Sequence, residues 1–180
     1  MHKSVFHKFI LLVLPLLLLL SCDTEDPFSI PPPNHDSVPD PIPLTGLTPV
    51  QVVPGVEAYI HEEGFGEFFV TARDDVSAYI TLRTDEGDII FSSFANENDN
   101  PSLIVMRFAG TIQNDFIYSV SRTYSPGLKA GILGMKQGES RTLVVSPEMG
   151  FKDALSGSLN AQYSENTLYY EIRISRILPD

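Results

Sequence analysis

The chain has 180 residues, of which 12 are Lys or Arg and 23 are Asp or Glu, so its formal net charge is −11 at pH 7. Such an acidic chain repels phosphate backbones and anionic membrane surfaces, so nucleic acid is not expected as a partner. Cys22 is the only cysteine, which excludes an intrachain disulfide, and the length suggests one domain with additional segments.

Residues 1–21 are typical of a signal peptide. Lys3 and Lys8 precede an apolar run from Phe9 to Leu20, and a run of about a dozen residues is too short for a membrane-spanning helix. The sequence Leu-Leu-Ser-Cys ending at Cys22 resembles the lipobox of bacterial lipoproteins. This resemblance implies a lipid anchor on Cys22 and a cell-envelope location, with the outer membrane expected, on its periplasmic or surface side. The alternative is an ordinary secretory signal in which the cysteine is incidental.

Residues 22–54 are predicted to form a lipidated N-terminus and a proline-rich tether. Nine prolines lie between Pro27 and Pro54, without helix or strand periodicity. An extended polyproline-like spacer of this kind would hold the domain away from the membrane, which only the lipid contacts. The acidic residues Asp23 to Asp26 are interpreted mainly as spacer, although in some Gram-negative groups they resemble a signal for surface export.

Residues 55–180 have the pattern of a β-rich domain. Apolar and polar residues alternate from Val76 to Arg83, which predicts a half-buried strand. The turn-forming residues 85–88 and the run from Ile89 to Phe94 complete a predicted hairpin. Further strands are expected at 140–145 and 168–178.

One short helix is predicted in this domain. Ser125 is a suitable N-cap, and Pro126 occupies the first helical position. Leu128, Ile132 and Met135 then recur at helical spacing. One helix among antiparallel strands indicates an α+β fold, with the helix packed on one face of the sheet.

Residues typical of hydrolases and metal sites are scarce. His61 is the only histidine of the predicted domain and is interpreted as a residue at the end of a strand. The acidic pairs Glu62-Glu63 and Asp74-Asp75 lie at predicted turns, where solvated carboxylates are common. No metal site, phosphate-binding loop or cofactor is therefore expected.

A series of motifs in a fixed order resembles the FKBP-type peptidyl-prolyl cis-trans isomerases. A short helix led by Gly127 ends near Met135, a Gly-Glu turn at Gly138 follows, and the next strand leads to Pro147 and Phe151. Residues 167–174 resemble the closing strand of this family, and residues 63–67 resemble its opening turn. The resemblance implies an FKBP-like twisted antiparallel sheet wrapped on one short helix.

The same resemblance implies isomerisation of X–Pro bonds in proline-containing peptides or exported proteins. Rotation about such a bond meets a barrier of about 20 kcal/mol, because the amide has double-bond character. The twisted transition state is less polar, so an apolar pocket with a few fixed hydrogen bonds favours it. Neither an acid, a base nor a cofactor is required.

The resemblance also assigns candidate residues of the family's pocket. Phe151 stands where the family usually has Tyr, Leu128 where many members have the Trp of the pocket floor, and Tyr170 at an aromatic wall. Ser125 provides the backbone N–H that receives the substrate carbonyl. Ile80 takes the position of another Tyr.

Two registers remain open in the first hairpin. Strict spacing places Ile90 at the family's Phe and Phe91 at its Asp. A one-residue bulge instead places Phe91 at the Phe and Ser92 at the Asp. The carboxylate and two Tyr hydroxyls are missing in both registers, so the alternative function is a non-catalytic FKBP-like lipoprotein that binds a peptide or protein partner.

Overall fold

The computed structural model describes residues 32–106, 111–113, 122–158 and 160–179. One compact unit runs from Pro33 to the end of the chain. In the described part of the chain, no helix is long and apolar enough to cross a membrane.

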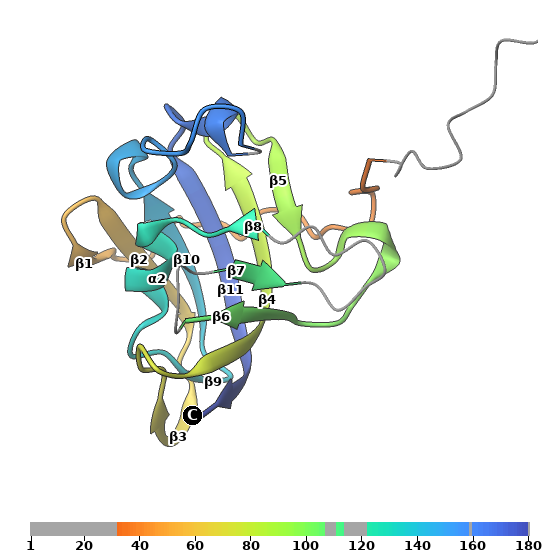
Figure 1. Ribbon diagram of the computed structural model, residues 1–180. Helices are drawn as coiled ribbons and strands as arrows, with labels where there is room; N and C mark the ends of the chain where they lie inside the picture. Colours follow the sequence, from red (N-terminus) through yellow and green to blue (C-terminus); the bar gives the residue numbers. More distant parts are fainter. Residues whose placement is uncertain (1–31, 107–110, 114–121, 159, 180) are drawn as a thin grey trace, which may run out of the picture. The chain divides into compact units, whose positions relative to one another are not determined.

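Nine strands of the described residues form one antiparallel sheet in the order β1-β2-β10-β11-β4-β6-β7-β8, with β5 paired to β4 (Figure 1). A two-stranded sheet is formed by β3 and β9. The strands are β1 (Val50–Val53), β2 (Val56–Glu62), β3 (Phe65–Phe69), β4 (Asp75–Thr84), β5 (Ile89–Ser92), β6 (Ser102–Val105), β7 (Thr111–Gln113), β8 (Arg122–Thr123), β9 (Lys136–Gln137), β10 (Ser140–Val145) and β11 (Leu168–Leu178).

The core lies between the sheet and the helix α2 (Pro126–Ile132), with short 3₁₀ helices η1 (Ala95–Glu97), η2 (Pro147–Met149) and η3 (Ala161–Tyr163) in the connections. Along β4 every second residue is buried against this core, as the alternation predicts. These inward residues are Val76, Ala78, Ile80 and Leu82.

The helix begins as predicted and ends slightly earlier. The Ser125 hydroxyl oxygen accepts a hydrogen bond from the Leu128 amide at 3.1 Å, and Pro126 is the first helical residue. The helix ends at Ile132, because Gly134 adopts a left-handed φ of 78°. Met135 is buried in the core but lies beyond the helix.

Two glycines let α2 lie directly on β10. A Cβ at Gly131 would stand 2.1 Å from Leu143 Cδ1, and a Cβ at Gly127 would stand 2.3 Å from Val145 Cγ1. Any larger residue would push the helix away from the sheet.

Part of the predicted tether contacts the domain. Residues 50–53 form β1, which pairs with β2, and the segment from Asn34 to Ile42 hydrogen-bonds to the opposite side of the sheet from α2. Figure 1 shows this segment, in orange, passing behind the strands. The compact unit therefore starts about twenty residues before the predicted boundary at residue 55.

Candidate functional site

Five of the predicted site residues belong to the hydrophobic core cluster between α2 and the sheet, together with the other buried apolar residues of the domain. Leu128 comes from α2, Ile80 from β4, Tyr170 from β11, Phe91 from β5, and Phe151 follows η2. The first three are completely buried, whereas Phe151 is 6% exposed and Phe91 is 9% exposed. The two phenylalanines are therefore the members of the predicted set that reach the edge of the cluster.

The sixth predicted residue, Ser125, carries a side-chain link to this cluster. The Tyr170 hydroxyl lies 2.9 Å from Ser125 Oγ, and both side chains are buried. Burial raises the pKa of Tyr170 well above its usual value, so its hydroxyl stays protonated and can donate to Ser125. Because Ser125 Oγ also caps the helix at Leu128, one oxygen ties β11 to the start of α2.

A bulge interrupts the first hairpin. Leu82 pairs with Phe91 while Arg83 pairs with Ile89, so Ile90 is the extra residue on β5. Both Ile90 and Phe91 are buried as a result, at 5% and 9% exposure. The bulge is the second of the two registers considered for this hairpin.

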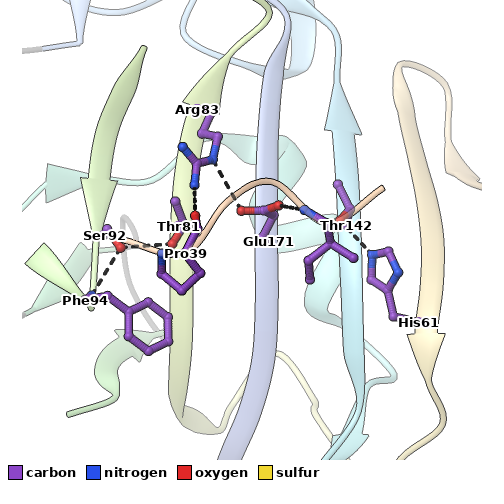
Figure 2. Close-up of polar contacts among 9 residues, drawn as sticks. Pro39, His61, Thr81, Arg83, Ser92, Phe94, Thr142 and Glu171 are labelled. Atoms are coloured by element: carbon purple, nitrogen blue, oxygen red, sulfur yellow. Dashed lines mark hydrogen bonds and ion pairs between the residues drawn. The ribbon is translucent and has the colours of Figure 1, made fainter. Parts of the chain in front are cut away.

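Ser92, which this register aligns with the family's Asp, faces away from the core. Its hydroxyl lies 2.9 Å from Thr81 Oγ1 and accepts a hydrogen bond from the Phe94 amide at 3.1 Å. Figure 2 shows these groups on the outer face of the sheet, away from α2. The next residue, Ser93, is fully buried and its hydroxyl accepts a hydrogen bond from the Ile80 amide at 3.0 Å.

Sequence reasoning missed Tyr124, which precedes the helix cap. Tyr124 is 6% exposed, belongs to the same cluster and donates from its hydroxyl to the Val105 carbonyl at 2.9 Å. Burial also raises the pKa of Tyr124, with a smaller effect from Asp75. Its aromatic character next to Ser125 was the available signal, but the contact with β6 depends on tertiary structure.

His61, the histidine considered for other chemistry, lies away from the predicted site residues. His61 is half-buried near the end of β2, with Nε2 2.8 Å from Thr142 Oγ1, on the face opposite α2 (Figure 2). Desolvation lowers its pKa, partly offset by Glu171 and Glu62. Within the ranges that the structure describes, no three His, Cys, Asp or Glu side chains gather as metal ligands do.

A surface cavity of about 240 Å³ lies away from the predicted site, beside β3 and β9. Phe65 and Phe68 on its wall are 65% and 81% exposed. None of the predicted site residues lines it. The cavity is lined by Phe65, Gly66, Phe68, Gln137, Ile177 and Pro179.

An antiparallel sheet wrapped on one short helix, with the apolar core between them, defines the α+β class of this domain. Residues 67–175 match the family described as FKBP-type peptidyl-prolyl cis-trans isomerase, and the match covers more than half of the chain. The chain belongs to this family. Its domain is an FKBP-type isomerase domain, a class whose substrates are proline-containing peptides or proteins.

Solved structures confirm the predicted α+β fold. The N-terminal domain of FKBP42 from Arabidopsis thaliana is 16% identical, with a TM-score of 0.55 over 78% of this chain and 98% of that domain. A peptidyl-prolyl cis-trans isomerase from Pseudomonas syringae pv. tomato is 14% identical, with a TM-score of 0.53 over 72% of this chain and 80% of that one.

The chain also resembles part of a longer protein. It spans half of the three FKBP domains of wheat FKBP73, with 16% identity, a TM-score of 0.50 and 74% of this chain covered. A comparison with curated protein sequences gave no match.

Proposed function

We propose that the protein is a lipid-anchored peptidyl-prolyl cis-trans isomerase that helps exported proteins to fold in the cell envelope. The observation that supports this proposal is the match of residues 67–175 to the FKBP family, in a domain whose hydrophobic core includes five of the six predicted site residues, with the sixth, Ser125, hydrogen-bonded to Tyr170. Such a region excludes water and so favours the less polar, twisted amide.

Each of the predicted site residues has a separate role in this proposal. Phe91 and Phe151, at the edge of the cluster, admit the proline ring, and Leu128 forms the floor. The Ser125 backbone N–H at the start of α2 receives the substrate carbonyl. The Tyr170–Ser125 hydrogen bond holds that end of the helix against β11 during turnover.

The location is proposed from the N-terminal sequence. Residues 1–21 end at a lipobox-like Leu-Leu-Ser-Cys, and lipid on Cys22 would attach the mature chain to a membrane. A multi-chain lipid anchor is sufficient, because each buried CH₂ contributes about 0.8 kcal/mol.

One observation favours a second function, in which the domain binds a partner without catalysis. Ile80, Leu128 and Tyr170 have no exposed surface, and Phe91 and Phe151 are only 9% and 6% exposed, so a proline ring enters only if core side chains move. The Ser92 hydroxyl is turned to the other face, which leaves this part of the site without the family's carboxylate.

A proline-limited refolding assay separates the two functions. Residues 23–180 are added to an unfolded substrate whose slow phase is X–Pro isomerisation, and the rate of that phase is measured. An isomerase accelerates it in proportion to its concentration, and Phe151→Leu reduces the acceleration. Phe68→Ala is the matched control, because Phe68 is an exposed aromatic outside the site. A folded domain that leaves the slow phase unchanged would establish the binding function instead.

A further inference from the structure

A pair of opposite charges is buried on the outer face of the sheet. Arg83 Nε on β4 lies 3.4 Å from Glu171 Oε2 on β11, and the two side chains are only 9% and 12% exposed. Burying an ion pair is costly unless further hydrogen bonds satisfy its remaining donors and acceptors. Something must therefore cover this face and supply those bonds.

The cover is the chain's own proline-rich segment (Figure 2). Arg83 Nη2 donates to the Pro39 carbonyl at 2.5 Å, and the Ile42 amide donates to Glu171 Oε1 at 2.6 Å. The two charges thus bind one carbonyl and one amide of the same extended segment. Prolines at 39, 41 and 43 remove competing amides and keep the segment extended.

A second group of contacts holds the N-terminal half of the segment. The Asn34 amide donates to Asn96 Oδ1 at 2.7 Å, and the Asn96 amide donates to the Asn34 carbonyl at 2.8 Å. The Ser37 hydroxyl donates to the Phe94 carbonyl at 2.5 Å and accepts from the Glu97 amide at 3.0 Å. Four hydrogen bonds therefore join this half to η1 and the residue before it.

These contacts compensate for an unfavourable backbone. Asn96 and Glu97 both have left-handed φ values, of 58° and 59°, which cost about 1 kcal/mol or more each for residues other than glycine. The Phe94 ring stacks on Tyr79 of β4 with ring centroids 5.4 Å apart, which fixes this turn to the outer face. The turn and the segment thus stabilise each other.

We propose that the outer face of the sheet is a binding site for an extended, proline-containing chain, and that residues 34–43, here called the strap, occupy it permanently. Residues 23–33, here called the leash, are then the only free segment between Cys22 and the domain. Arg83 and Glu171 are the residues that recognise the strap backbone. The leash rests on the proposed lipid anchor, whereas the binding site does not.

The leash has a calculable length. With the strap bound, only residues 23–33 separate the domain from Cys22, and 11 residues span roughly 40 Å at most. A tether that ran free to residue 54 would span up to roughly 110 Å. The strap therefore keeps the domain near the membrane. The chain then leaves the domain toward the membrane from the outer face of the sheet.

Amide hydrogen exchange in residues 23–180 tests the binding site. We expect the Ile42 amide to exchange at least tenfold more slowly than in a free peptide, because it donates to a charged acceptor. The double variant Arg83→Met/Glu171→Met removes both recognising charges without leaving one unpaired, and Ile42 should then exchange at the free rate. Protection of the Ile172 amide in β11 reports that the fold persists. Exchange of Ile42 at the free rate in the unmodified chain would overturn the proposal.

Lipidated full-length chain in a supported bilayer tests the leash. Neutron reflectometry should place the domain within roughly 40 Å of the surface, and the double variant should shift it outward. Glu148→Met/Lys152→Met, which removes an exposed ion pair with side chains 65% and 47% exposed, is the matched control and should not shift it. Equal distances in the unmodified chain and the Arg83/Glu171 variant would refute the leash while the exchange result still decides the binding site. A Cys22→Ser chain that stays on the bilayer would refute the lipid anchor, and the leash with it.

Discussion

Changing Ser125 to Ala removes an oxygen that takes part in two buried hydrogen bonds. The helix cap to the Leu128 amide is lost, at a cost of about 1 kcal/mol. The Tyr170 hydroxyl is left buried without that partner, which costs about 1–3 kcal/mol more. Ser125→Ala should therefore lower the free energy of unfolding by about 2–4 kcal/mol.

Tyr170→Phe has a smaller effect, because Ser125 keeps its bond to the helix. We expect a loss of about 1 kcal/mol. The informative variant is Ser125→Ala/Tyr170→Phe, in which both partners of the buried pair are gone and mainly the cap is lost. Its loss should be only about 1 kcal/mol, so the second substitution restores stability to the first.

Chemical denaturation of residues 23–180 and its variants measures these differences in free energy, and thermal denaturation measures the corresponding shifts in Tm. A loss of 1 kcal/mol corresponds to about 2–4 °C in Tm for a domain of this size. The double variant should therefore melt several degrees above Ser125→Ala alone. If the effects of the two substitutions simply add, the shared-oxygen arrangement at the start of α2 is wrong.

Three further outcomes follow from other parts of the structure. In a protease-coupled assay, Phe151→Leu should lower kcat/KM for an X–Pro peptide about tenfold, which is equivalent to about 1.4 kcal/mol. An unchanged kcat/KM would show that Phe151 is not part of the site. Gly131→Ala should destabilise the domain by about 1–3 kcal/mol because its Cβ meets Leu143, and calorimetry that finds no loss would contradict the close helix packing. Burial lowers the pKa of His35, with a further effect of Arg83, so protonation opposes strap binding. The contribution of His35 to strap binding should thus be complete above its free pKa of about 6.5 and be lost as the pH falls below that value. Protection of the Ile42 amide from exchange measures this pH dependence, and His35→Gln should abolish the dependence.

Local signals explain why much of the fold was predictable. The N-cap at Ser125 and the proline that follows act within one helical turn, so they define the start of α2 regardless of the rest of the chain. The alternation in β4 reflects packing of one face on the apolar core, although Thr81 and Arg83 on the other face are buried as well. The predicted strands at 140–145 and 168–178 coincide with β10 and β11. Strand β5 is shorter than predicted, because the Ser92 hydroxyl binds the Phe94 amide and turns the chain.

Long-range contacts explain what sequence reasoning missed. A proline-rich segment has the same local conformation whether it is free or bound, since polyproline structure has no internal hydrogen bonds. Its binding here depends on Arg83 and Glu171, which lie far along the chain. The Ser125–Tyr170 hydrogen bond likewise joins residues 45 positions apart. Neither pairing leaves a periodic pattern in the sequence.

Exchange NMR on a short X–Pro peptide tests the isomerase claim most directly, because it observes the bond itself. Uncatalysed interconversion takes tens of seconds at 25 °C, too slow for exchange peaks on a sub-second mixing time. A catalytic amount of residues 23–180 should produce cis–trans exchange peaks on that timescale, and Phe151→Leu should weaken them. Peptide signals that shift or broaden on binding without any cis–trans exchange would show that the domain binds proline peptides but does not isomerise them.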